Sequence, residues 1–140
     1  MQSARGFIAV IMSIFWIGHA AAEEVQPPIA GIEDTITAQI DAFLNDDFAE
    51  AFTYASPNIQ GFFGTSERFG QMVRNGYPMV WRPGDVQYLE LRDVAGNLWQ
   101  KVLIRDEQGG THILDYQMIQ TSDGWKINGV QILAEPDVSA

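Results

Sequence analysis

Histidine and cysteine, the side chains that most often act as bases, nucleophiles and metal ligands, are scarce in this sequence. The 140-residue chain has no cysteine and two histidines, His19 and His112. Thiolate catalysis, thiolate zinc sites and disulfide bonds are therefore excluded, and so few histidines argue against a transition-metal site. The carboxylates form no D-x-[DN]-x-[DN]-G calcium loop. We therefore expect the protein to use no metal and no cofactor.

His112 has a carboxylate close by in the sequence, Asp115, and the two could in principle form a catalytic dyad. Both residues fall in a segment whose apolar residues alternate with period two, which predicts a β-strand. On a regular strand, residues three apart point to opposite faces. The spacing therefore predicts that His112 and Asp115 do not form a dyad.

Three aromatic residues, Phe63, Tyr77 and Trp81, lie in or beside segments rich in glycine and proline, where packing requires them least. Aromatic side chains are core residues by default, and that interpretation stays open for all three. The alternative is that they form the wall of a pocket for an apolar or aromatic ligand, or for a side chain of a protein partner. Tyr54 is a further candidate for this pocket.

The charge of the chain limits its partners. Eighteen acidic residues and eight basic ones give a formal net charge of −10. Such a surface repels the phosphates of nucleic acids and the headgroups of anionic lipids. We therefore expect no nucleic-acid partner.

The first 22 residues have the pattern of a cleavable signal peptide. A short start that carries one charge, on Arg5, is followed by an apolar run over residues 7–17. This run is too short to span a membrane, which takes about 20 apolar residues. Small residues at Ala20 and Ala22 fit the A-x-A cleavage rule, which places the cut before Glu23. We therefore expect an exported protein, periplasmic or secreted, that leaves the membrane after cleavage.

The chain after the cut begins with a leader, residues 23–30, that contains two adjacent prolines and is predicted to be flexible. Apolar residues at spacings of three and four then predict three amphipathic helices. These helices cover residues 31–45, 48–55 and 66–75. Residues 58–64 are predicted to form a loop, because Ser56 and Pro57 end the second helix.

From Met79 onward the apolar pattern changes to period two, which is typical of strands. Residues 79–81 lie between two prolines and are predicted to form only a short edge strand. Longer strands are predicted at residues 86–93, 98–105, 111–120 and 125–133. Turns that contain glycine connect them, so neighbouring strands should be antiparallel, and residues 134–140 should be frayed. The sequence therefore predicts one α+β domain over residues 31–133, with three N-terminal helices packed on one face of a curved, antiparallel, four- to five-stranded sheet.

Short motifs spread along the chain resemble those of a known family. They are FAEAF (48–52), ASP (55–57), FGT (63–65), FGQMVRNGY (69–77), VWRP (80–83), LDY (114–116) and DGWKINGV (123–130). On these residues, the chain resembles a bacterial family of domains of unknown function, number 4864, within the nuclear-transport-factor-2-like (cystatin-like) superfamily. The resemblance implies a curved sheet that wraps a long helix into a cone, often with an internal pocket, and an exported location. It implies no activity and no catalytic residue.

Some relatives in that superfamily are isomerases and dehydratases, so the resemblance also implies an alternative function. Such a metal-free acid/base enzyme would need a carboxylate base inside the cone, for which Asp115 is the candidate. It would also need a tyrosine donor, for which Tyr116, Tyr54 and Tyr77 are candidates. On a strand Asp115 and Tyr116 face opposite ways, so Asp115 should lie outside the cone if the helices cover Tyr116. We therefore favour an exported, non-catalytic domain, monomeric or homodimeric, that binds a small apolar ligand or a protein partner.

Overall fold

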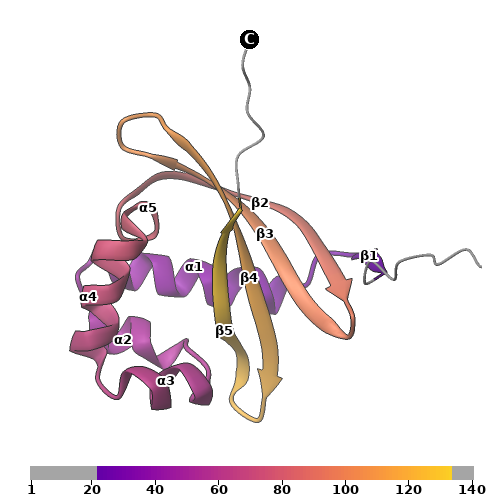
Figure 1. Ribbon diagram of the computed structural model, residues 1–140, viewed down its shortest axis with the longest axis horizontal. Helices are drawn as coiled ribbons and strands as arrows, with labels where there is room; N and C mark the ends of the chain where they lie inside the picture. Colours follow the sequence, from indigo (N-terminus) through magenta and orange to yellow (C-terminus); the bar gives the residue numbers. More distant parts are fainter. Residues whose placement is uncertain (1–21, 134–140) are drawn as a thin grey trace, which may run out of the picture.

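The computed structural model describes residues 22–133, which form a layer of helices on one face of an antiparallel sheet (Figure 1). The helices are α1 (Ala30–Leu44), α2 (Phe48–Thr53), α3 (Pro57–Phe63), α4 (Ser66–Gly76) and α5 (Pro78–Trp81). The strands are β1 (Glu23–Gln26), β2 (Pro83–Val94), β3 (Asn97–Asp106), β4 (Thr111–Thr121) and β5 (Gly124–Leu133). They pair in the order β1-β2-β3-β4-β5. The α+β class that the sequence predicted is confirmed.

The longest helix, α1, lies across the inner face of the sheet, and α2 to α5 gather near one of its ends (Figure 1). Its buried apolar stripe consists of Ile32, Ile36, Ile40 and Phe43. These residues recur at spacings of three and four, which places them on one face of the helix. The helix begins and ends within one residue of the predicted bounds, because this stripe is long and uninterrupted.

The four long strands form a meander joined by tight turns. Gly96 and Gly124 lie in two of these turns with φ of 86° and 100°, a conformation that favours glycine. The residues that lie in register on the helix-covered face include Leu91, Gln100, Tyr116 and Val130. The strands begin and end within three residues of the predicted positions. The period-two pattern of apolar residues and the glycine turns therefore predicted these bounds well.

Two segments differ from the prediction because a proline begins a helix as readily as it ends one. Residues 58–64 were predicted as a loop, but residues 58–63 belong to α3. Pro57 is the first residue of this helix, and the Ser56 hydroxyl accepts a hydrogen bond from the backbone N–H of Ile59. Residues 79–81, predicted as an edge strand, form α5, which begins at Pro78. Proline suits the first helical position because its fixed φ is helical and the missing N–H has no intrahelical partner there. The described chain thus has five helices rather than three.

The predicted flexible leader is partly ordered. Residues 23–26 form β1, which pairs antiparallel with β2, so that Glu23 lies opposite Val94 and Gln26 opposite Leu91. This pairing makes β1 the fifth strand of the sheet, in place of residues 79–81. The predicted signal peptide, apart from residue 22, and the predicted frayed tail lie outside the described residues.

No helix within residues 22–133 is long and apolar enough to cross a membrane.

Candidate functional site

A cavity of about 410 Å³ lies between the helical layer and β5. Its apolar wall includes Ile59, Phe63, Phe69, Met72, Val73, Tyr77, Val80, Ile127 and Val130. These side chains come from α3, α4, α5 and β5 and from the residue between α4 and α5. The volume falls within the range of about 300–1,000 Å³ that is common for small-molecule sites. The cavity is therefore the main candidate for a binding site.

The β5 side of the cavity is held against the helices by hydrogen bonds at the junction of α2 and α3. Ser56 is fully buried, and its backbone N–H donates to the carbonyl oxygen of Ile127 at 2.8 Å. Its hydroxyl donates to Oδ1 of Asn128 at 2.7 Å. The pairing of β4 with β5 shifts register between Gln117 and Met118, and this irregularity turns Asn128 towards Ser56. The wall contributed by β5 is therefore fixed by specific bonds.

Phe69 anchors the opposite wall in a cluster of aromatic rings. The Phe69 ring centroid lies 5.7 Å from that of Phe63, 5.9 Å from that of Phe43 and 5.2 Å from that of Phe52. The first of these contacts is edge-to-face, the second stacked and the third tilted, and such contacts are favourable at these distances and hold rings in defined orientations. The aromatic wall is therefore preformed by the core.

Two side chains of the cavity wall carry polar groups, those of Gln39 and Tyr77. The Tyr77 hydroxyl donates to the carbonyl oxygen of Val130 at 3.0 Å. The Gln39 side-chain nitrogen, Nε2, donates to the carbonyl oxygen of Ala51 at 3.2 Å. Among the described residues, no charged side chain lines the cavity. The site can therefore offer apolar contact and a few neutral hydrogen bonds.

Of the four residues that the sequence suggested for a pocket, the structure brings only two together in the cavity. Phe63 and Tyr77 both line the cavity, whereas Trp81 and Tyr54 do not. Nε1 of Trp81 donates to the carboxylate of Asp46 at 3.0 Å, and the Arg82 guanidinium lies 4.1 Å from the centroid of the Trp81 ring. Hydrogen bonds from Arg82 and Trp81 hold the pKa of Asp46 below its usual value. Trp81 therefore belongs to a surface cluster outside the cavity.

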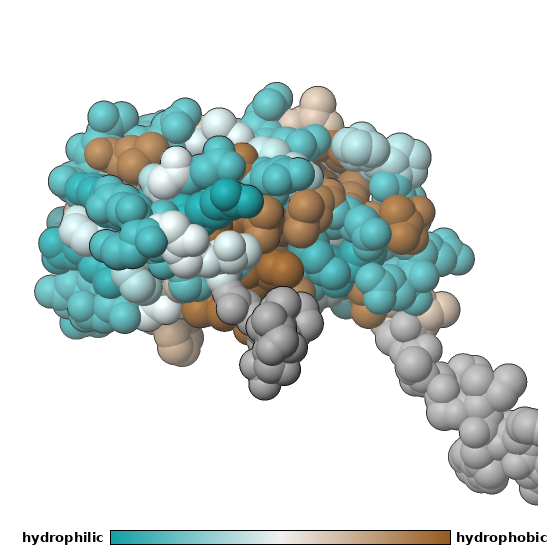
Figure 2. Space-filling view, turned by 90° about the horizontal axis from the view of Figure 1, so that it is seen from above, coloured by the Kyte–Doolittle hydropathy of each residue, from teal (hydrophilic) through white to brown (hydrophobic). Residues whose placement is uncertain are grey.

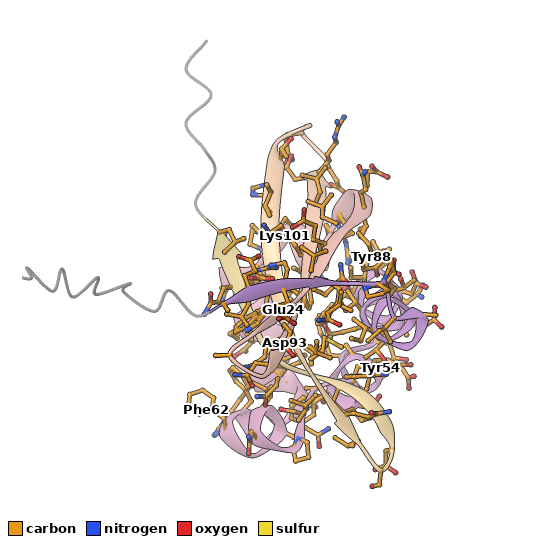
Figure 3. All side chains as sticks on the ribbon, turned by 90° about the vertical axis from the view of Figure 1, so that its right-hand side faces the viewer. Glu24, Tyr54, Phe62, Tyr88, Asp93 and Lys101 are labelled. Carbon is orange, nitrogen blue, oxygen red and sulfur yellow. The ribbon has the colours of Figure 1, made fainter. Side chains whose placement is uncertain are left out.

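Tyr54 lies near the surface of α2, where its hydroxyl donates to the Glu50 carboxylate at 2.7 Å. This bond raises the pKa of Tyr54. Phe62, the neighbour of Phe63 in sequence, projects from α3 away from the protein and is 81% exposed. Figure 3 shows Tyr54 and Phe62 far apart on the surface. Neither side chain contributes to the cavity.

Asp115 and Tyr116, the suggested acid/base pair, lie on opposite faces of β4. Tyr116 is fully buried on the helix-covered face. Asp115 lies on the other face but is only 5% exposed, because both its oxygens accept hydrogen bonds from Arg92 at 2.8 Å. Nε of Arg92 also donates to Glu23 at 2.6 Å. Asp115 and Tyr116 therefore do not converge on one site.

The Tyr116 hydroxyl is the only buried side-chain nitrogen or oxygen atom of the described residues that has no hydrogen-bond partner. Burial raises the pKa of Tyr116, so the phenol stays neutral. An unpaired buried hydroxyl destabilises the folded state. The ring itself belongs to the buried hydrophobic core.

We expect Tyr116→Phe to stabilise the fold by about 1 kcal/mol, because the change removes an unpaired polar atom and keeps the ring. The matched control is Tyr88→Phe, which removes bonds to Thr37 at 2.6 Å and to the carbonyl oxygen of Glu33 at 3.0 Å. Tyr88 lies beside α1 (Figure 3), and its variant should be less stable than the wild type. Urea unfolding of both variants measures the difference. A loss of stability in Tyr116→Phe equal to that in Tyr88→Phe would show that the hydroxyl has a partner.

Comparison with known proteins identifies the family of this domain. Residues 26–140 match the model of a family described as a domain of unknown function (DUF4864). The chain belongs to this family. No curated protein and no solved structure matches it significantly. The description of the DUF4864 family names no activity, so the geometry of the site is the basis for a functional proposal.

His112 has a partner in this DUF4864 domain that the sequence pattern did not reveal. Its Nε2 lies 2.8 Å from Oδ2 of Asp106, across the turn between β3 and β4. Oδ1 of Asp106 accepts hydrogen bonds from the backbone N–H groups of Gln108 and Gly110. The bond from His112 and these backbone bonds lower the pKa of Asp106. Asp106 therefore organises the turn, and, as expected, His112 does not pair with Asp115.

Of the residues that line the cavity, the sequence analysis suggested only Phe63 and Tyr77. It also missed three polar residues in or beside the wall, Gln39, Ser56 and Asn128. Ser56 and Asn128 meet only in the folded chain, so local spacing carries no sign of their bond. Gln39 could have been found, because it lies seven residues after Ile32 and three after Ile36, on the buried stripe of α1. Within residues 22–133, no three histidine, aspartate or glutamate side chains converge to form a metal site.

Hydrophobic side chains also reach the surface away from the cavity. Figure 2 shows a group of them around the point where the chain leaves β5, and Ile132 near that point is 47% exposed. Ile132 does not line the cavity.

Proposed function

We propose that this DUF4864 domain is a non-catalytic binding protein whose cavity takes a small, mainly apolar ligand. The observation that carries the proposal is the wall itself: an aromatic and aliphatic surface, built from helices and β5, that lines a cavity of about 410 Å³. Burial of apolar ligand surface there contributes roughly 25 cal/mol per Å². Because no charge lines the wall within the described residues, binding should depend little on salt.

The acid/base alternative has no comparable support. An isomerase or dehydratase of this type needs a carboxylate and a phenol donor beside the bound substrate. No carboxylate is among the described residues that line the cavity. Asp115 bonds Arg92 on the opposite face of the sheet, and the Tyr116 hydroxyl is sealed from the cavity. We therefore propose that the domain binds its ligand without converting it.

The proposal has two further parts, the superfamily to which the domain belongs and the cellular location of the protein. A helical layer packed on a meander sheet, with a cavity between the helices and β5, supports placing the domain in the nuclear-transport-factor-2-like superfamily. The charged start, short apolar run and alanine-rich end of residues 1–22 support export to the periplasm or beyond the cell. The intact mass of the native protein tests the second part, since removal of residues 1–22 lowers it.

Propylbenzene is a suitable probe for the cavity because it is neutral and almost wholly apolar. We expect calorimetric titration of the wild type to show saturable binding with a negative heat-capacity change, the signature of apolar burial. Met72→Trp should weaken binding at least about tenfold, equivalent to about 1.4 kcal/mol, because the larger side chain occupies the cavity. Tyr77→Ala, which removes part of the wall, should also weaken it.

Two matched controls separate the cavity from general effects. Gln71 neighbours Met72 on α4 but is exposed and outside the wall, so Gln71→Trp should bind as the wild type does. Trp81→Ala removes an aromatic ring outside the cavity and should also leave the affinity unchanged. Binding that is equally weak in the Met72 and Gln71 variants would refute the cavity as the site.

A further inference from the structure

A buried glutamine gives the cavity a specific polar contact. Gln39 lies in the middle of α1, on the buried stripe, and is only 3% exposed. A polar side chain is unfavourable in such a place unless its polar atoms find partners. The amide nitrogen has one, the carbonyl oxygen of Ala51, and this bond fixes which end of the amide faces α2. The amide oxygen, Oε1, therefore points away from this bond with α2.

Oε1 of Gln39 has no hydrogen-bond partner among the described residues, where the only bond of this side chain is the one through Nε2. Oε1 is also not fully buried. Within residues 22–133, the Tyr116 hydroxyl is the only fully buried side-chain nitrogen or oxygen atom without a hydrogen-bond partner. Oε1 must therefore reach open space, and the open space that Gln39 lines is the cavity. An acceptor without a donor thus faces an otherwise apolar chamber.

The remaining polar group of the wall has the same character. The Tyr77 hydroxyl uses its proton in the bond to Val130, so towards a ligand it too can only accept. A charged ligand would lose its hydration without gaining a counter-charge, because no charged side chain among the described residues lines the wall. The geometry thus disfavours a charged ligand and offers a hydrogen-bond donor of a neutral ligand an acceptor.

We propose that the cavity selects neutral ligands with an apolar body and a hydrogen-bond donor, such as a phenol or an alcohol, and that Gln39 Oε1 accepts the hydrogen bond. This inference rests on the proposed function and adds the ligand class to it. A site with a fixed acceptor disfavours an analogue that lacks the donor, because the acceptor is then left unpaired.

The test compares 4-propylphenol with 4-propyltoluene, which replaces the hydroxyl by a methyl group of similar size. Each is titrated into the wild type and into Gln39→Met, which keeps the length of the side chain and removes its acceptor. The two probes differ in their partition from water, so the informative quantity is the change in their affinity ratio between the proteins. We expect the ratio of phenol to toluene affinity to fall at least about tenfold in Gln39→Met.

Gln60→Met is the matched control, because Gln60 also donates through Nε2 to backbone carbonyl oxygens, those of Phe52 and Ala55, but does not line the cavity. Its affinity ratio should equal that of the wild type. If Gln39→Met does not fold, a measurement on the wild type takes the place of its titrations: the ¹³C chemical shift of the Gln39 side-chain carbonyl. This shift should change when 4-propylphenol binds but not when 4-propyltoluene binds. Binding of both probes with an unchanged ratio, or a carbonyl shift that ignores the phenol, would overturn the inference and leave the proposed function standing. If neither probe binds to the wild type, the proposed function fails, and the inference fails with it.

Discussion

Asp115→Asn is expected to destabilise the domain by about 3 kcal/mol, although the residue has no part in the cavity. The Arg92 side chain is 8% exposed, and the carboxylate of Asp115 holds both its terminal nitrogens at 2.8 Å. In the wild type the bond to this carboxylate raises the pKa of Arg92. In the variant the guanidinium still cannot avoid the loss by deprotonation, because arginine stays charged in proteins. A buried charge without its main partner is strongly unfavourable.

The control for this prediction is Glu23→Gln. Glu23 also contacts Arg92, but its side chain is 51% exposed, so its loss should cost less than about 1 kcal/mol. Guanidinium chloride unfolding measures both variants, and the double variant Arg92→Met/Asp115→Leu should recover much of the lost stability. Equal midpoints for Asp115→Asn and Glu23→Gln would show that the ion pair is solvated. Propylbenzene affinity should be unchanged in Asp115→Asn under conditions where it remains folded.

Trp125→Ala should destabilise the domain by about 3 kcal/mol, near the lower end of the range for large aromatic residues, because the indole is partly buried. Trp125 begins the last strand after the Gly124 turn and packs on the first turn of α1. A β-carbon at Gly31 would lie 2.7 Å from Cδ1 of the indole. Thr35 adds a bond from its hydroxyl to the carbonyl oxygen of Trp125 at 3.3 Å. This contact joins the two ends of the domain.

The close approach of Gly31 and Trp125 supplies the control. Gly31→Ala should destabilise the wild type through the clash but have a much smaller effect in a Trp125→Ala background. Thermal unfolding of the two single variants and the double variant gives this coupling as a double-mutant cycle. Additive effects would mean that the indole does not pack on Gly31.

The sequence predicted the elements whose signals are local and repeated. The stripe of α1 and the alternation along β4 recur over ten residues or more, so their bounds were close. Pro57 and Pro78 were misread because the same residue type ends one element and begins another. The Ser56 hydroxyl caps the helix that begins at Pro57, whereas the helix that begins at Pro78 has no side-chain cap. β1 was missed because pairing with β2 brings together residues about 70 positions apart. Local patterns contain no trace of such a contact.

The site was predicted only in part for a related reason. Phe63 and Tyr77 were selected for their breaker-rich surroundings, and both lie in the cavity wall. Trp81 had the same surroundings but turns to Asp46 and Arg82 instead. Strand parity placed Asp115 on the correct face but gave no sign of Arg92, which reaches it from a strand two positions away in the sheet. Side-chain partners across the sheet are decided by register, which a single sequence does not reveal.

The most direct test of the binding cavity is to locate a bound probe by nuclear Overhauser effects between propylbenzene and the methyl groups of the protein. The account predicts contacts from the ring and propyl chain to the methyl groups of Met72, Val73 and Val130, which line the cavity. It predicts none to Val102 and Leu114, which are fully buried in the core and outside the wall. Contacts confined to other methyl groups, or no contacts at saturating probe, would contradict it.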